Sequence, residues 1–286
     1  MKKNNWLIYT LTTTVLWGVW GALTELPEKA GFPSNLGYSV WALTMIPCAI
    51  FALGLNRFKL EHDTKSIFYG LMIGFTGSGG TVLLFEALKL GPAFIIFPII
   101  SLSPILTVIL SIIFLKEKAS KQSWIGIVIA LIAIFMLSYS KPDGIDIKGY
   151  LWLVFSILIF VMWGVQAYFM KLANETMKAE SIFTYMAITA VVLIPLAILM
   201  TDFHQKINWG FNGPYLTAII QIMNAIGALS LVYAMRYGKA IIVTPMTALY
   251  PIITIILSLF INAVIPSPMM IIGMILALIA IYLFAK

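Results

Sequence analysis

The chain has 286 residues, of which 61% are hydrophobic and 10% are charged, and its mean hydropathy is +1.00. A soluble globular domain carries about 25% charged residues, so this composition excludes a soluble enzyme. Ten apolar spans of about 20 residues would leave about 86 residues for loops and ends, which is too few for an extramembrane domain.

Long apolar windows bounded by charged residues, Gly and Pro predict ten membrane-spanning helices. In chain order the predicted spans are Trp6–Leu26, Leu36–Leu55, Ile67–Leu88, Ala93–Leu115, Gln122–Ser140, Gly149–Lys171, Glu180–Met200, Pro214–Met235, Ala240–Ala263 and Ser267–Phe284. The basic start before the first span is typical of a signal peptide, but no small-residue cleavage site follows it, so we expect that span to remain in the mature protein. The predicted fold class is therefore an all-α integral membrane protein.

The formal charge of +7 does not indicate nucleic-acid binding, because the 18 Lys and Arg residues lie in short connections and not on one face. Alternate connections divide them unevenly. One set holds Lys2, Lys3, Arg57, Lys59, Lys65, Lys116, Lys118, Lys121, Lys171, Lys178, Arg236, Lys239 and Lys286, and the other holds only Lys29, Lys89, Lys141, Lys148 and Lys206. The positive-inside rule then predicts that both termini are cytoplasmic, which requires an even number of spans.

An internal repeat is the most informative feature of the sequence. A shift of 147 residues aligns a series of spaced identities: Ala87 with Ala234, Gly91 with Gly238, Ala93 with Ala240, Pro98 with Pro245, Pro104 with Pro251, Thr107 with Thr254, Ser111 with Ser258 and Ser120 with Ser267. A shift of 146 aligns the Trp-Gly-Val triplet at 17–19 with the one at 163–165.

The repeat predicts two five-helix units, residues 1–140 and 141–286. Because each unit has an odd number of spans, the second must enter the membrane from the opposite face, which makes the repeat inverted. Inverted repeats are typical of transporters whose substrate site lies near the membrane midplane between the two units. We therefore expect alternating access around such a site.

Several segments resemble the EamA-type transporters of the drug/metabolite transporter superfamily. They are the Trp-Gly pair in the first span of each copy, the stretch Phe85–Ala93 (FEALKLGPA), and Phe114–Lys118 (FLKEK) followed by Trp124 and Gly126. The resemblance covers nearly the whole chain. It implies a ten-helix carrier of small metabolites in a bacterial inner membrane, usually an exporter of amino acids or related compounds. Sugar-uptake members share the fold, so the substrate stays open. The position that matches Glu117 is Val264, so no role is assigned to that acid.

Polar side chains at membrane depth are costly unless they face the bundle interior or a wet cavity. Gln221 and Asn224 are three residues apart in the eighth span, hence on one helical face, and their repeat mates are Gly74 and Gly77. One interpretation is an asymmetric pocket that orients a polar substrate. The other is amide hydrogen bonding between helices, with the glycines allowing close packing.

Tryptophans form a second group of candidates. Trp17 and Trp163 are repeat mates, and Trp20 is matched by Gln166. Their rings could stack on planar or cationic parts of a ligand. Trp17 lies about 16 Å into its span, too deep for an interfacial belt, so the alternatives are a cavity wall or helix packing.

The fourth and ninth spans carry proline pairs, Pro98 with Pro104 and Pro245 with Pro251. Proline frees a carbonyl and kinks a helix, so we expect hinges there. Among the neighbouring polar residues, Tyr250 and its repeat mate Ser103 are placed on the list of substrate contacts.

Ionisable groups are scarce within the spans, and none lies near the middle of one. Glu86, with Lys89 one turn on, falls at a span end and fits an interfacial ion pair; if protons drive transport, Glu86 is the candidate coupling residue. No phosphate-binding loop, metal-ligand spacing or catalytic constellation is found, so we expect neither a cofactor nor an enzyme.

These observations favour an inner-membrane carrier of a small neutral or zwitterionic metabolite. A sugar or other metabolite uptake carrier of the same fold is the alternative within transport, and a membrane scaffold or receptor is the alternative outside it. The expected partners are a small-molecule substrate and the lipid bilayer. Oligomeric state and coupling ion are left open.

Overall fold

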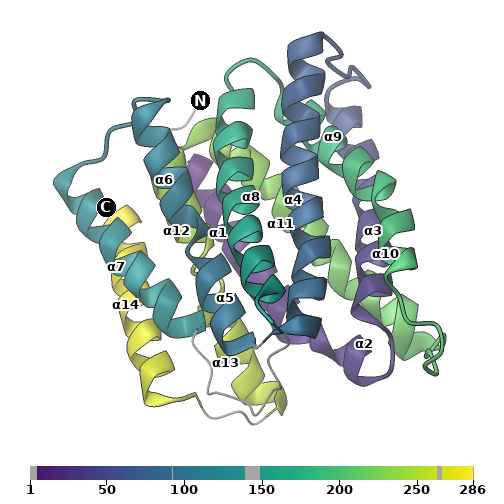
Figure 1. The fold of residues 1–286 in the computed structure, drawn as a ribbon. Coiled ribbons are helices and arrows are strands. Elements are labelled where there is room, and N and C mark those ends of the chain that lie inside the picture. Colours follow the sequence, from purple (N-terminus) through teal and green to yellow (C-terminus); the bar gives the residue numbers. More distant parts are fainter. Residues whose placement is uncertain (1–4, 92, 139–148, 263–265, 286) are drawn as a thin grey trace.

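The computed structural model describes residues 5–91, 93–138, 149–262 and 266–285. Within these ranges the chain is a bundle of α-helices without a strand (Figure 1). Ten helical segments, some of them interrupted, are long and apolar enough to cross a membrane. The predicted all-α fold with ten spans is confirmed.

The helices of the first half are α1 (Asn5–Leu23), α2 (Glu25–Lys29), α3 (Ser34–Leu55), α4 (Thr64–Leu90), α5 (Ala93–Ser101), α6 (Ser103–Ile113) and α7 (Lys121–Ser138). Those of the second half are α8 (Leu151–Ala173), α9 (Ala179–Val192), α10 (Ile194–Leu199), α11 (Leu216–Tyr237), α12 (Ala240–Thr247), α13 (Pro251–Asn262) and α14 (Pro268–Ala285), with a π-helical turn at Phe211–Tyr215 before α11. The predicted span ends Ser140 and Ala263 lie outside the described residues.

The fourth and ninth spans are interrupted at matching places. α5 gives way to α6 at Leu102, just before Pro104, and α12 gives way to α13 at 248–250, just before Pro251. Proline cannot donate a backbone hydrogen bond, so a new helix begins readily at it. Pro98 and Pro245 lie inside α5 and α12.

Pairs of helices from opposite halves form the centre of the bundle. α1 packs along α11, and its repeat mate α8 packs along α4, the mate of α11. In the same way, α3 packs on α11 as its mate α9 packs on α4. α13 also packs on α1 as its mate α6 packs on α8. α7 and α14, which are mates of each other, pack together at one edge (Figure 1). This pairing is what a twofold inverted repeat requires.

Matching hydrogen bonds hold these central pairs. Trp17 Nε1 donates to the backbone oxygen of Asn224, and Trp163 Nε1 donates to that of Gly77, both at 3.3 Å. Asn224 and Gly77 are themselves mates at a shift of 147 residues. Each indole therefore ties its helix to the central helix of the other half.

Hydroxyl groups repeat the same arrangement one helix away. Thr107 Oγ1 donates to the oxygen of Gly164, and Thr254 Oγ1 donates to that of Gly18, both at 2.9 Å. Gly18 and Gly164 follow the two tryptophans, and the absence of a side chain lets the broken helices approach. The repeated Trp-Gly pair is thus explained by packing between the halves.

Tryptophans near the span ends differ in burial. Trp152, near the start of the sixth span, has the position of an interfacial anchor, but it is 7% exposed and packs against Gly91, where an added Cβ would lie 2.2 Å from its Cγ. A glycine at the end of α4 leaves room for the ring. Trp124 and Trp209, by contrast, are exposed.

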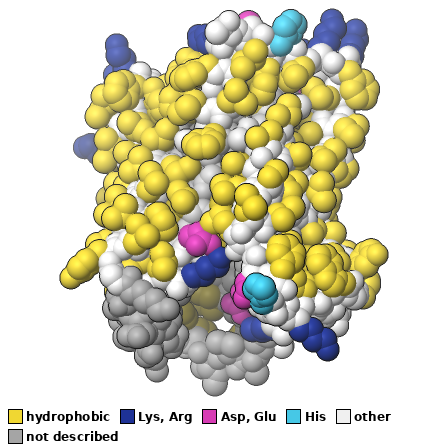
Figure 2. Space-filling model, turned by 45° about the vertical axis from the view of Figure 1, so that its right-hand side comes forward, with side chains coloured by type: hydrophobic (Ala, Val, Ile, Leu, Met, Phe, Trp, Pro, Cys, Tyr) yellow, Lys and Arg dark blue, Asp and Glu magenta, His cyan; other side chains and the backbone are white. Residues whose placement is uncertain are grey.

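The surface matches a membrane protein. Hydrophobic side chains cover the middle of the molecule in Figure 2, and Lys and Arg gather at its upper end. α1 begins and α14 ends toward the same side of the bundle (Figure 1). At this end Asp63 accepts a hydrogen bond from the Ser66 backbone N–H at 3.1 Å and caps α4, and hydrogen bonds from Ser66 hold the pKa of Asp63 below its ordinary value.

The symmetric packing predicts the effect of adding one methyl group. A Cβ at Gly227 would lie 2.6 Å from Trp17 Cδ1, and one at Gly80 would lie 2.5 Å from Trp163 Nε1. Gly227→Ala and Gly80→Ala should each destabilise the protein by about 1–3 kcal/mol, because the rings cannot move without losing their carbonyl contacts. Thermal unfolding in detergent measures this. Gly54→Ala is the control, since its nearest neighbour is Phe58 at 3.8 Å. Equal melting temperatures for all three variants would contradict the prediction.

Candidate functional site

A cavity of about 1000 Å³ lies between the two halves of the bundle. α1, α3, α4 and α11 supply much of its wall, and the breaks in the fourth and ninth spans reach it as well. It extends to α2, to the connection before α3 and to residues 200–205, so these segments form its mouth. Figure 2 shows charged side chains around a hollow in the lower part of the molecule.

The cavity is asymmetric because the packing of the two halves is not fully symmetric. At the end away from the mouth, α12 packs against α6 and α8. α5, the mate of α12, makes no comparable contact with α13 and α1 in the described part of the chain. As far as the described residues show, the cavity therefore opens at one end and is closed at the other.

The structure brings the residues selected for substrate contact to this cavity. All eight line it: Trp17, Trp20, Ser103, Trp163, Gln166, Gln221, Asn224 and Tyr250. They come from the first, fourth, sixth, eighth and ninth spans, and the third span adds Gly74 and Gly77.

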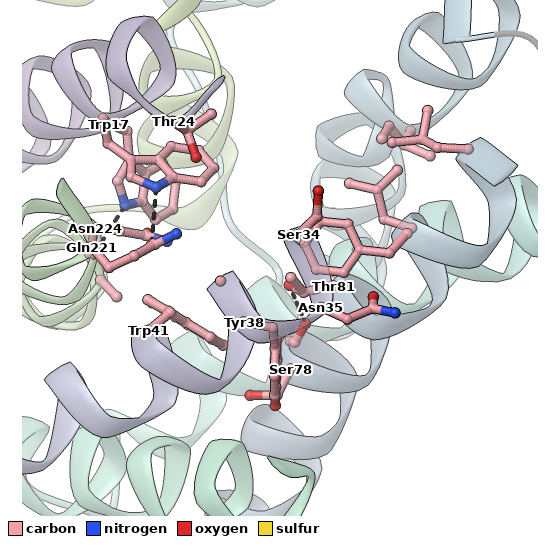
Figure 3. A pocket seen from close by; sticks show the side chains of 18 of the residues that line it. Trp17, Thr24, Ser34, Asn35, Tyr38, Trp41, Ser78, Thr81, Gln221 and Asn224 are labelled. Atoms are coloured by element: carbon pink, nitrogen blue, oxygen red, sulfur yellow. Dashed lines mark hydrogen bonds between the residues drawn. The ribbon is translucent and has the colours of Figure 1, made fainter. Parts of the chain in front are cut away.

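The two amides of α11 form a small network with α1 (Figure 3). Gln221 Oε1 accepts from Trp20 Nε1 at 3.0 Å and from Asn224 Nδ2 at 3.3 Å. This leaves the side-chain N–H groups of Gln221 and the side-chain oxygen Oδ1 of Asn224 without a hydrogen bond to a described residue. The network therefore offers a donor and an acceptor side by side.

Aromatic rings lie next to these amides. Trp17 meets Tyr250 edge to face, with ring centroids 6.1 Å apart. Both rings are only partly buried and line the cavity, so Trp17 contributes to helix packing and to the cavity wall at once. The two interpretations of this tryptophan are not exclusive.

The opposite wall carries the mates of these groups. Gln166, the mate of Trp20, lies against Gly77, where an added Cβ would be 2.2 Å from its Nε2. Where α11 offers amides, α4 offers glycines, and the space at Gly77 is filled by Gln166 of α8 and that at Gly74 by Thr189 of α9. The predicted asymmetry between the mates is present in the geometry.

The second span contributes a face that sequence reasoning missed. Asn35, Tyr38 and Trp41 of α3 line the cavity (Figure 3). Asn35 Nδ2 donates to Met200 O at 2.6 Å and Tyr38 Oη to Ala190 O at 3.0 Å. Their spacing of three residues, which places them on one helical face, is the signal that could have found them.

Charged side chains on the cavity lining are confined to its mouth: Glu25, Glu28, Lys29, Lys89 and Asp202. Lys89 forms an ion pair with Glu86 and also donates to Met200 O at 3.1 Å. Glu86 does not line the cavity, and it has the interfacial pairing expected of it. Its role in coupling stays a prediction.

Within the described residues no group of three or more His, Cys, Asp or Glu side chains could hold a metal ion. The hydroxyl, amide and aromatic groups of the cavity can bind a small molecule by hydrogen bonds and ring contacts.

Comparisons with known proteins agree with this architecture. A crystal structure of a protein superposes with a TM-score of 0.80 at 16% sequence identity, covering 99% of this chain and 97% of that chain. An uncharacterized protein of Methanocaldococcus jannaschii is 37% identical over 97 residues, which are 34% of this chain and 70% of the relative. An uncharacterized transporter of Archaeoglobus fulgidus is 28% identical over 155 residues, 52% of this chain and 51% of the relative.

The model of the EamA-like transporter family matches residues 4–139 and again residues 148–286. The two matches together cover nearly the whole sequence. This chain therefore belongs to the EamA-like transporter family.

Proposed function

We propose that this membrane transporter is a secondary carrier that moves a small neutral or zwitterionic metabolite by alternating access around the cavity. The observation that carries the proposal is the cavity itself, which lies between inverted halves and, in the part of the chain that the structure describes, opens at one end and is closed at the other. If each half adopted the packing that the other half has in this structure, the mouth would close and the other end would open. Export of an amino acid or a related compound is the direction we favour.

The chemistry of the wall supports the substrate class. The interior presents amides, hydroxyls and aromatic rings, whereas the acidic and basic side chains stay at the mouth. A strong anion or cation would lose its hydration without gaining an opposite fixed charge. A zwitterion or a neutral polar molecule can instead use the paired donor and acceptor of Gln221 and Asn224.

A sugar carrier is the second candidate, and the same polar groups support it. Screening purified protein by thermal shift against the twenty common amino acids and a panel of neutral sugars separates the two, because a ligand of the folded state raises its melting temperature. Counterflow of a hit in liposomes, with and without a proton gradient, then tests transport and coupling. A compound that stabilises the protein but is never moved across liposomes would favour a receptor.

The amide network predicts the effect of removing its polar groups. Gln221→Met and Asn224→Leu should each weaken binding of a hit about three- to tenfold, because each removes a hydrogen bond of about 0.5–1.5 kcal/mol. Titration by thermal shift measures the change. Gln122→Met is the matched control, since Gln122 donates to Leu283 O at 3.1 Å outside the cavity. Unchanged affinity in both cavity variants would remove the proposed contact.

The charge distribution predicts the orientation in a plasma membrane, the inner membrane of a bacterium. We expect both termini in the cytoplasm and the cavity mouth on the outer face. In a Cys48→Ala background, Lys29→Cys should react with an impermeant maleimide in intact cells, and Lys59→Cys should react only after the cells are opened. Cys48 must be replaced because it is the one native cysteine. The reverse labelling pattern would contradict the proposed orientation of the protein in the membrane.

A further inference from the structure

The closed end of the cavity centres on the junction between α11 and α12. The cavity lining on α11 stops at Leu231 and resumes on α12 at Thr244, so the turn at Tyr237–Ala240 lies beyond the cavity floor. At this turn α11 ends with free carbonyls and α12 begins with free N–H groups. Both sets are bound by charged side chains from other elements.

A lysine of α8 binds the end of α11. Lys171 Nζ donates to Met235 O at 2.9 Å and to Gly238 O at 2.6 Å. The positive charge sits at the C-terminus of a helix, where the helix dipole favours it. Because Lys171 belongs to α8, this contact ties a wall helix of the cavity to the closing turn.

A glutamate from the first half binds the start of α12. The two carboxylate oxygens of Glu117 accept the N–H groups of Ala240 and Ile241 at 3.1 and 3.0 Å. A carboxylate at a helix N-terminus is favoured by the dipole and makes charge-assisted hydrogen bonds. Glu117 lies in the connection between α6 and α7, and Lys239 Nζ binds Lys118 O in the same connection at 2.5 Å. The contact therefore bridges the two halves.

The repeat mates of Glu117 and Lys171 belong to the other end of the molecule, and their side chains differ in chemistry. At a shift of 146 the mate of Lys171 is Glu25, and at a shift of 147 the mate of Glu117 is Val264. Glu25 is exposed and pairs with Lys29 of its own helix at 2.7 Å. A carboxylate could not bind helix carbonyls as Lys171 does, and a valine could not bind N–H groups as Glu117 does. The difference between the two ends is therefore already present in the sequence.

We propose that Glu117 and Lys171 form a latch that holds this end closed, favours the state open at the mouth, and must release when access switches. The inference rests on the proposed alternating access. It assigns a role to two residues that do not line the cavity, so it concerns the balance between the two states and not substrate recognition.

The test follows an introduced thiol in the cavity. In a Cys48→Ala background, Ser103→Cys places the thiol on the partly exposed cavity wall, and an impermeant maleimide is added to right-side-out and to inside-out vesicles. The parent should react through the mouth and slowly from the latch end. Glu117→Ala and Lys171→Met should each raise the rate from the latch end at least fivefold, with Glu117→Gln intermediate and Lys171→Arg close to the parent.

Glu175→Gln is the matched control, because it removes an exposed carboxylate from the same end without breaking either contact. Size-exclusion elution and melting temperature identify variants that have failed to fold, and the milder Glu117→Gln then carries the test. Latch-end rates equal to the parent in folded Glu117 and Lys171 variants would overturn the latch. A parent thiol that does not react through the mouth would instead overturn the proposed cavity access, so the two failures are distinguishable.

Discussion

The structure depends on the close approach of helices from opposite halves, α1 to α11 and α8 to α4. In a bilayer the hydrophobic effect gives helices no reason to associate, so packing and interhelical hydrogen bonds must hold them. Here glycines supply the approach, and the indole N–H of Trp17 and of Trp163 fixes it by binding a backbone oxygen across the interface. The cavity lies between the two halves that these contacts join.

The cavity wall is polar on one side because the two halves differ in side chains at matching positions. Gln221 and Asn224 stand where the other half has Gly74 and Gly77, so twofold symmetry is kept in the backbone and broken in the side chains. A symmetric scaffold provides two related packings, whereas an asymmetric wall can orient one polar ligand. Charges at the mouth stay near water, which avoids the cost of burying them.

Two kinds of asymmetry therefore have separate roles. The amides and rings of the wall concern which molecule binds, and the charged contacts at the α11–α12 turn concern which end is open. The second set lies outside the cavity lining and touches only helix ends. Exposed N–H and C=O groups at a helix end need hydrogen-bond partners in every state of the transporter. A side chain that provides those partners in one state therefore stabilises that state.

The sequence by itself determined the membrane class, the ten spans and the internal repeat, because hydropathy, proline and repeat spacing are local or periodic signals. It also selected eight candidate residues that the structure places on the cavity wall. It left the role of Trp17 divided and missed Tyr38 and Trp41, since α3 reads as an apolar span until its neighbours are known. It assigned nothing to Glu117, whose partners lie more than 120 residues away in the chain. Only the tertiary structure decides such pairings. The sequence does not show which backbone N–H group a side chain will bind, because that depends on how the two halves pack.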